Sequence, residues 1–282
     1  MRSAATAAVL GMVLAAGCGP MRGPAAPPAA APWGAMRLGP GQVMAEHNAW
    51  ADSIQHIWAR AAVMLNFPTG DPKDSRIKAD LEGHLFLDRP DHLYVHGEVL
   101  GQEVFSMGMN EDRFWLWIRP RVNTVWTWSR GGPGERRFVV TPDDLLTALG
   151  LFRIDLDPAA QAVFVAQERH YVLSEERTFA GLRVPCRRVW FDRGTLRPVR
   201  VDLFDETGRR ILLAELLRYD RVGAADVCTV YRVRFYGDDE VDLVLRLSAV
   251  SLDKRPNPKV FEYRVPPGAK EEDLDKAPHP EP

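Results

Sequence analysis

Hydrophobic and polar residues alternate over most of the chain between residues 61 and 250, in short runs typical of strands. Turn-forming residues separate these runs, as in Arg89-Pro90-Asp91, Arg193-Gly194-Thr195 and Glu206-Thr207-Gly208. The pattern predicts an antiparallel meander without the repeats of a propeller or solenoid. The expected strands are 61–67, 77–87, 92–100, 103–109, 113–118, 124–128, one around 163, 170–173, 187–192, 198–204, 211–219, 229–236 and 241–250.

Two segments depart from this alternation and predict helices. From residue 42 to residue 60, apolar residues fall close to helical spacing. A second, shorter helix begins at Thr141, a good N-cap, with Pro142 at its first position. Its apolar stripe is either a lid over a cavity or a plug that fills the core, and it consists of Leu145, Leu146, Leu149 and Phe152.

The first residues have the pattern of a secretory signal, residues 1–17. Arg2 supplies a positive charge, and the uncharged segment that follows is shorter than the ~20 residues of a membrane-spanning helix. Leu14-Ala15-Ala16-Gly17-Cys18 resembles the bacterial lipobox, which implies lipid attachment at Cys18. One acyl chain anchors a protein only marginally, so we expect several, palmitate among them. The alternative is an ordinary signal peptide followed by a coincidental cysteine.

Composition then divides the rest of the chain into three parts. Residues 18–39, rich in Ala, Pro and Gly, predict an extended tether after the anchor. Residues 40–270 predict a single domain, since no internal linker divides them. The charged residues 271–282 predict a frayed tail. The formal net charge of −2, with interleaved acidic and basic residues, argues against a nucleic-acid partner.

Cys186 and Cys228 are the two cysteines that remain after Cys18. In an oxidising compartment such a pair suggests a disulfide. Both lie in strand-like runs whose pairing cannot be derived from the sequence, so two buried free thiols are the alternative.

Four tryptophans lie on two strands that a short turn connects: Trp115, Trp117, Trp126 and Trp128. If Trp117 pairs with Trp126, all four share one face and form a wall suited to an apolar ligand. A slip of one residue places the two pairs on opposite faces. Ordinary core packing explains the same residues without a ligand.

The chemistry of catalysis is not evident in the sequence. It contains no Gly-x-Ser-x-Gly elbow, no Gly-x-Gly-x-x-Gly turn and no P-loop. His92 and His96 lie in strand-like sequence, with no carboxylate or cysteine beside them at metal-ligand spacing. We therefore expect no enzymatic activity, no metal and no cofactor.

Several short motifs occur in a recognisable order. They are Gly83-His84-Leu85-Phe86-Leu87-Asp88-Arg89-Pro90, Asn110-Glu111-Asp112 before Phe114-Trp115-Leu116-Trp117, the segment 188–192 before Leu196-Arg197-Pro198-Val199, and the closing segment 260–268. This order resembles the Lol-type lipoprotein carriers and receptors of the Gram-negative periplasm. The resemblance covers nearly the whole chain after Cys18.

The resemblance implies an α+β fold, mostly antiparallel β, in which a curled sheet forms an open, unclosed barrel. Helices would cover a hydrophobic cavity that holds acyl chains. Arg89 would correspond to the family's lid-latching arginine, and the tryptophans and the apolar stripe named above would line the cavity and its lid. Family carriers are usually soluble, whereas an anchor at Cys18 is a property of the receptor.

The sequence therefore predicts a lipid-anchored protein that faces the periplasm and binds acyl chains of lipoproteins or lipids. Its partners would be a membrane and other envelope transport proteins. Gly19, rather than Asp, follows Cys18, which is compatible with the outer membrane. The alternative is a structural or interaction lipoprotein of the envelope with a filled core and no small-molecule ligand.

Overall fold

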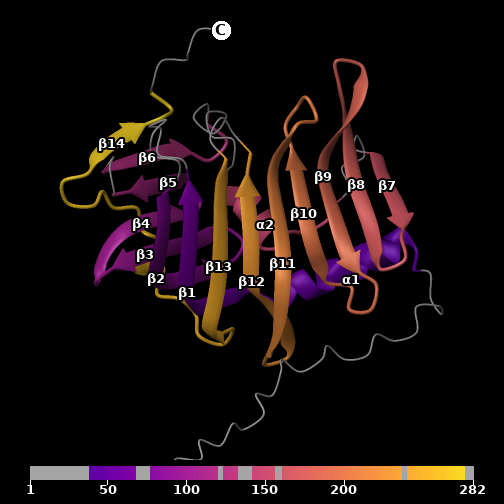
Figure 1. Ribbon diagram of the computed structural model, residues 1–282, viewed down its shortest axis with the longest axis horizontal. Helices are drawn as coiled ribbons and strands as arrows, with labels where there is room; N and C mark the ends of the chain where they lie inside the picture. The colour runs from indigo at the N-terminus through magenta and orange to yellow at the C-terminus, as the bar shows by residue number, and fades with distance from the viewer. Residues whose placement is uncertain are drawn as a thin grey trace, which may run out of the picture. The chain divides into compact units, whose positions relative to one another are not determined.

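The computed structural model describes residues 38–67, 77–119, 123–132, 142–155, 161–236 and 240–276 (Figure 1). All of them lie in one compact unit, Met36–Pro282. The signal segment, Cys18, most of the tether, Thr141 and residues 277–282 lie outside the described residues. Within the described ranges, no helix combines the length and the apolar character needed to cross a bilayer.

The described strands form one 14-stranded sheet, curled and unclosed, with β14 at one edge and β7 at the other. This confirms the prediction of a mostly antiparallel, open sheet. The strands are β1 (His56–Phe67), β2 (Ile77–Asp88), β3 (His92–Val99), β4 (Gln102–Met109), β5 (Arg113–Ile118), β6 (Thr124–Ser129), β7 (Gln161–Ala166), β8 (His170–Phe179), β9 (Leu182–Asp192), β10 (Pro198–Phe204), β11 (Arg210–Val222), β12 (Ala225–Phe235), β13 (Val241–Ser251) and β14 (Lys270–Asp273).

Two antiparallel meanders make up the whole sheet except β14. Strands β1 to β6 follow one another in space, as do β7 to β13, and the pairing of β1 with β13 joins the two halves (Figure 1). In that pairing Ala61 lies opposite Leu247, and Val63 lies opposite Leu245. Because side chains alternate between the faces of a strand, this register places all four on one face.

That face carries most of the buried apolar residues of both halves of the sheet, and we call it the inner face. Its buried residues form one continuous cluster with those of the two α-helices. Members from both halves of the sheet include Leu85, Phe114, Leu173 and Leu212, each almost completely buried. The helices therefore cover the inner face, while the opposite, outer face carries no α-helix of the described residues.

Helix α1 (Pro40–Asp52) is shorter than the predicted helix. Gly39 precedes it as N-cap and Pro40 occupies the first position, where the missing N–H costs nothing. Residues from His56 onward belong to β1, where Ile57 pairs with Leu87. Apolar residues at 54, 57, 58 and 61 fit a helical stripe as well as the start of a strand, and pairing with β2 decides between them.

Along the chain, helix α2 (Pro142–Ala148) comes between the last strand of the first meander, β6, and the first strand of the second, β7. Gly150 follows it with a positive φ of 77°, a conformation in which glycine is favoured at helix ends. A Cβ atom at this position would lie 2.8 Å from Leu216 and 3.0 Å from Pro198, so the site also lacks room for one. Glycine thus lets the chain turn against β10 and β11.

Residues 258–276, which overlap the start of the predicted tail, contain two short elements. A short 3₁₀-helix, η2 (Pro258–Phe261), is followed by β14, which pairs in parallel with β6. Leu274 is buried, although charged residues surround it in the sequence. The four consecutive charged residues at 270–273 lack the alternation that predicts a strand. They can still form β14, because an edge strand tolerates charge where a central strand does not.

Candidate functional site

The cover of the inner face consists of α1 and the segment Pro142–Asp155. Figure 1 shows α1 running across β8 to β12. At its start the backbone N–H of Leu38 donates to the hydroxyl of Tyr171 in β8, at 3.1 Å. Near its end the indole of Trp50 donates to the carbonyl of Asp226 in β12, at 2.8 Å. Both contacts tie the helix to the second half of the sheet.

The two parts of the cover are joined by polar contacts. The Nε2 of His47 donates to the carbonyl of Phe152, at 2.9 Å. The side chain of Asn48 makes two hydrogen bonds with the backbone of Ile154, of 2.8 and 3.2 Å. Asp52 forms an ion pair with Arg153 at the exposed end. These contacts join the two parts of the cover.

His47 is completely buried between Trp50, Phe152 and Phe191, whose ring centroids lie 4.9 to 5.6 Å from its own. Removal from water lowers its pKa to about 4, since the charged imidazolium loses hydration and Arg187 adds repulsion. The ring is therefore neutral at pH 7 and donates through Nε2. Its Nδ1 has no hydrogen-bond partner among the described residues.

Arg89 connects the first half of the sheet to the cover. It lies in the turn between β2 and β3, and its guanidinium donates a hydrogen bond to the carbonyl of Ala51 in the last turn of α1. Asp52 lies 4.0 Å away. Burial lowers the pKa of the guanidinium, and the Asp52 carboxylate opposes that shift. Arg89 therefore contacts the C-terminal end of α1.

The apolar stripe of the second predicted helix faces the sheet. Leu149 and Phe152 are buried, and Leu145 and Leu146 pack half-buried against the same core. Arg187 of β9 lies over the ring of Phe152, 4.4 Å from its centroid, and pairs with Glu175. In this structure these side chains fill the space beside the inner face.

The four tryptophans do not form one wall. Trp115 lies opposite Thr127 and Trp117 opposite Val125, which is the one-residue slip and not the Trp117–Trp126 pairing. Trp126 and Trp128 therefore pack into the inner-face core, while Trp115 and Trp117 belong to a separate outer-face cluster. The sequence left both registers open, because the connecting turn could hold either.

The structure favours one of the two alternatives left open for the cysteines, the free thiols. Cys186 and Cys228 are free thiols. They lie in β9 and β12, with β10 and β11 between them. Three strand spacings of about 4.8 Å separate such residues, roughly twice the distance that a disulfide bridges. Cys228 is buried, as that alternative expected, whereas Cys186 is half-buried.

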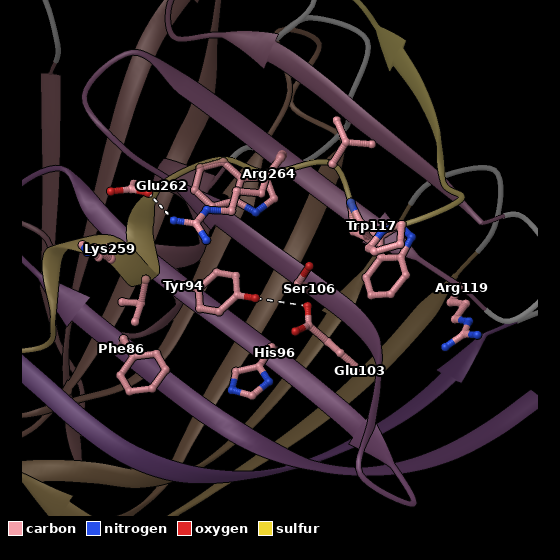
Figure 2. A pocket seen from close by; sticks show the side chains of 15 residues that line it. Phe86, Tyr94, His96, Glu103, Ser106, Trp117, Arg119, Lys259, Glu262 and Arg264 are labelled. Atoms are coloured by element: carbon pink, nitrogen blue, oxygen red, sulfur yellow. Dashed lines mark hydrogen bonds and ion pairs between the residues drawn. The ribbon is translucent and has the colours of Figure 1, made fainter.

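A groove of about 780 Å³ lies on the outer face, between strands β2 to β5 and the segment Lys259–Pro267 (Figure 2). Its floor includes Phe86, Tyr94 and His96, whose rings lie side by side and face the groove. The three ring planes deviate from parallel by only 7° to 18°. We call these three residues the ring platform.

The segment that closes the groove is fixed to the sheet at three points. Asn110 donates to the carbonyl of Phe261, at 3.2 Å, and Phe261 is buried. Tyr263 donates to Glu271, at 2.8 Å, and its ring contacts Trp115. Asn123 donates to the carbonyl of Gly268, at 2.8 Å. The groove is therefore a formed feature between two anchored elements.

Polar groups of both kinds surround the ring platform. The Tyr94 hydroxyl donates to Glu103, at 3.1 Å, and burial together with that carboxylate raises the pKa of Tyr94, so the phenol stays neutral. Glu262 and Arg264 form an ion pair on the closing segment. Lys259 forms no ion pair within the described residues.

Beside the platform, His84 Nδ1 lies 3.3 Å from His96 Nε2, and the proximity of His96 adds to burial in lowering the pKa of His84. Among the residues that the structure describes, no group of three or more His, Cys, Asp or Glu could hold a metal ion. The two imidazole rings stack, with their centroids 5.3 Å apart.

Sequence reasoning missed the ring platform. A signal was present, since Phe86 and Tyr94 flank a short turn at positions of matching parity, as do His84 and His96. The cross-strand pairs Phe86–Tyr94 and His84–His96 became definite only with the register of β2 and β3.

No protein-family model matches the sequence, and no curated protein matches it significantly. Several solved structures match the fold. A LolA superfamily protein from Nitrosomonas europaea is 12% identical with a TM-score of 0.52, and the match covers 80% of this chain and 99% of that one. A DUF1329 family protein from Desulfovibrio piger is 13% identical, also at 0.52, with 79% and 95% covered.

A third match is a domain from Vibrio parahaemolyticus assigned to outer membrane lipoprotein sorting. It is 12% identical with a TM-score of 0.52, and the match covers 78% of this chain and 94% of that one. At such low identity the likeness concerns the fold. The resemblance to the Lol-type proteins is thus confirmed at the level of the fold, which this chain shares with the three structures.

Proposed function

We propose that this protein is a lipid-anchored envelope protein that binds acyl chains of lipoproteins or lipids between the inner face and its cover. The observation that carries the proposal is the attachment of the cover. The inner face is largely apolar in both halves of the sheet, and Arg89 of the first half holds the end of α1 through its hydrogen bond to the carbonyl of Ala51. A cover held in this way over an apolar surface suits reversible opening.

The proposed mechanism uses no covalent chemistry. In the closed state, side chains such as Trp50, Leu149 and Phe152 occupy the inner face. An acyl chain would replace them when the cover lifts, and burial of each methylene contributes ~0.8 kcal/mol. Because closing the cover buries the protein's own side chains again, closure would compete with the cargo and favour its release.

The fold likeness to proteins of lipoprotein sorting supports this reading, and so does the predicted anchor at Cys18. In this proposal the protein resides in the cell envelope, and acyl chains on Cys18 anchor it to the outer membrane. A sheltered cavity would hold the acyl chains of its cargo, and the protein would serve as a carrier or a receptor.

A direct test uses the compact unit Met36–Pro282, which contains every described helix and strand. We expect a fluorescent fatty acid to bind it saturably and to quench tryptophan emission, since Trp50 lies in the cover. Absence of saturable binding would contradict the proposal. It would favour the second function, an interaction lipoprotein with a filled core, which the packed inner face of this structure supports.

The Arg89→Leu variant tests the role of the cover. Removal of the contact with Ala51 shifts the equilibrium toward the open state, so the fatty acid should associate faster than with the unaltered protein. Stopped-flow fluorescence measures this rate. Arg209→Leu is the matched control, since Arg209 also lies in a turn but is exposed. Equal association rates for both variants would remove Arg89 from the mechanism.

A further inference from the structure

The outer-face groove is separate from the inner face, because the residues of its floor point away from the core under the helices. In β3, Leu93 and Val95 point to the inner face, whereas Tyr94 and His96 point to the groove. Acyl-chain binding under the cover does not involve these outward residues. The groove is therefore a second candidate site, separate from the inner face.

Its size is that of a ligand site. A volume of about 780 Å³ falls in the range of small-molecule pockets. Trp115 and Trp117, at the side of the groove, are each only 4% exposed, and the closing segment is anchored at both of its ends. A ligand would meet a pre-formed surface and would cost little reorganisation.

The floor selects a flat ligand. Centroids of neighbouring rings of the ring platform lie 5.5 to 6.4 Å apart, with nearly parallel planes (Figure 2). Such an arrangement offers a broad, level apolar surface. An aromatic face is electron-rich and attracts the slightly positive hydrogens of C–H bonds. Sugar rings present such hydrogens on one face and carry their hydroxyls around the edge.

The surrounding polar groups select a ligand with both donors and acceptors. Glu103 accepts one hydrogen bond from Tyr94 and has a second oxygen for a hydroxyl donor. Lys259 and Arg119 offer N–H donors at the margin, and Ser106 adds a hydroxyl. Acidic and basic side chains are mixed there, so a neutral hydroxyl-rich ligand is better matched than an anion or a cation.

From this combination we infer that the outer-face groove is a carbohydrate-binding site, in which sugar rings stack on Phe86, Tyr94 and His96 and hydrogen-bond to Glu103. The mixture of charges disfavours nucleic acid, which requires a basic surplus for its phosphates. The polar groups that surround the platform disfavour an acyl chain, which would leave them without partners. Neither conclusion depends on the function proposed for the inner face.

The probes are two β-1,4-linked tetrasaccharides, cellotetraose and chitotetraose, titrated into Met36–Pro282 by calorimetry and tryptophan fluorescence. We expect saturable binding of at least one of them. Phe86→Ala should weaken it about tenfold, because one of the three rings of the platform is lost. Phe179→Ala is the matched control, since this phenylalanine is exposed at the tip of the β8–β9 hairpin and should leave binding unchanged.

Glu103→Gln keeps the shape of the side chain and removes its charge, so it serves as a second variant if Phe86→Ala fails to fold. It should also weaken binding. The proposal is overturned if neither sugar binds, or if binding is unaffected by the folded groove variants. It is overturned equally if those variants abolish binding of single-stranded DNA or of a fatty acid instead, and fatty-acid binding that they leave unchanged belongs to the inner face.

Discussion

At the residue scale, His47 links the two parts of the cover while it is buried and neutral. Its folded pKa of about 4 lies below the ordinary value of 6.5. In this range the unfolded chain binds more protons than the folded chain, so the free energy of unfolding falls as the pH drops. The contribution of the neutral ring is complete above pH 6.5 and is lost toward pH 4.

We therefore expect the protein to be less stable at pH 5 than at pH 8, by about 2 kcal/mol from this histidine. Urea denaturation at both values measures the difference. In His47→Gln the amide can still donate to Phe152, and no imidazole titrates. A variant with the same pH dependence as the unaltered protein would show that other groups cause the effect.

Gly150 is a second residue with a definite role. Any side chain at this position would strain the backbone, because φ is positive. Its Cβ atom would also clash with Leu216. Gly150→Val should lower the free energy of unfolding by more than about 1 kcal/mol, since strain and overpacking add. Thermal or urea unfolding would detect it, with Gly181→Val as a control, because Gly181 also has positive φ but an open environment.

At the scale of elements, the β5–β6 hairpin divides its tryptophans between two faces. Trp128 is 2% exposed in the inner-face core, whereas Trp126 is only half-buried there. We expect Trp128→Ala to cost about 3–5 kcal/mol of stability and Trp126→Ala clearly less. Equal losses in urea denaturation would contradict the packing of this hairpin.

Most strands could be predicted from the sequence because alternation and turn residues act locally. The predicted segments 113–118 and 198–204 coincide with β5 and β10. Pairing could not be predicted to the same degree, since register depends on contacts between distant segments. That is why the tryptophan hairpin, the ring platform and the separation of Cys186 from Cys228 became definite only in three dimensions.

The elements of the cover show the same limit. The second helix and the Arg89 turn were expected from local signals and the family resemblance, and both occur where predicted. The length of α1 depended on competition between helix and strand at residues 54–61. Its hydrogen bonds through His47 and Asn48 connect residues about 105 positions apart and left no pattern in the sequence.

At the scale of the molecule, the stability of the fold should not depend on disulfide formation between its two thiols. Since Cys186 and Cys228 lie three strand spacings apart, a reducing agent should not change the melting temperature. Calorimetry with and without dithiothreitol measures this. A drop in melting temperature on reduction would indicate a bridge that this fold does not allow.

The predicted anchor is tested on the complete chain. Labelled palmitate should be incorporated at Cys18 and the protein should fractionate with membranes. Cys18→Ser should remove both properties, because no other acylation site is predicted. Cys186→Ser, which changes a thiol inside the sheet, serves as the control and should leave both unchanged.

The pairing of β1 with β13 also has a consequence in time. Strand β1 follows the first helix, and its partner lies near the other end of the domain, so the two halves of the sheet cannot join until almost all of the chain is present. Contacts between distant segments slow folding, and unpaired strand edges aggregate meanwhile. A chain delivered from its N-terminus would therefore expose the edge of β1 until its last long strand arrives, and during that interval it would depend most on chaperones.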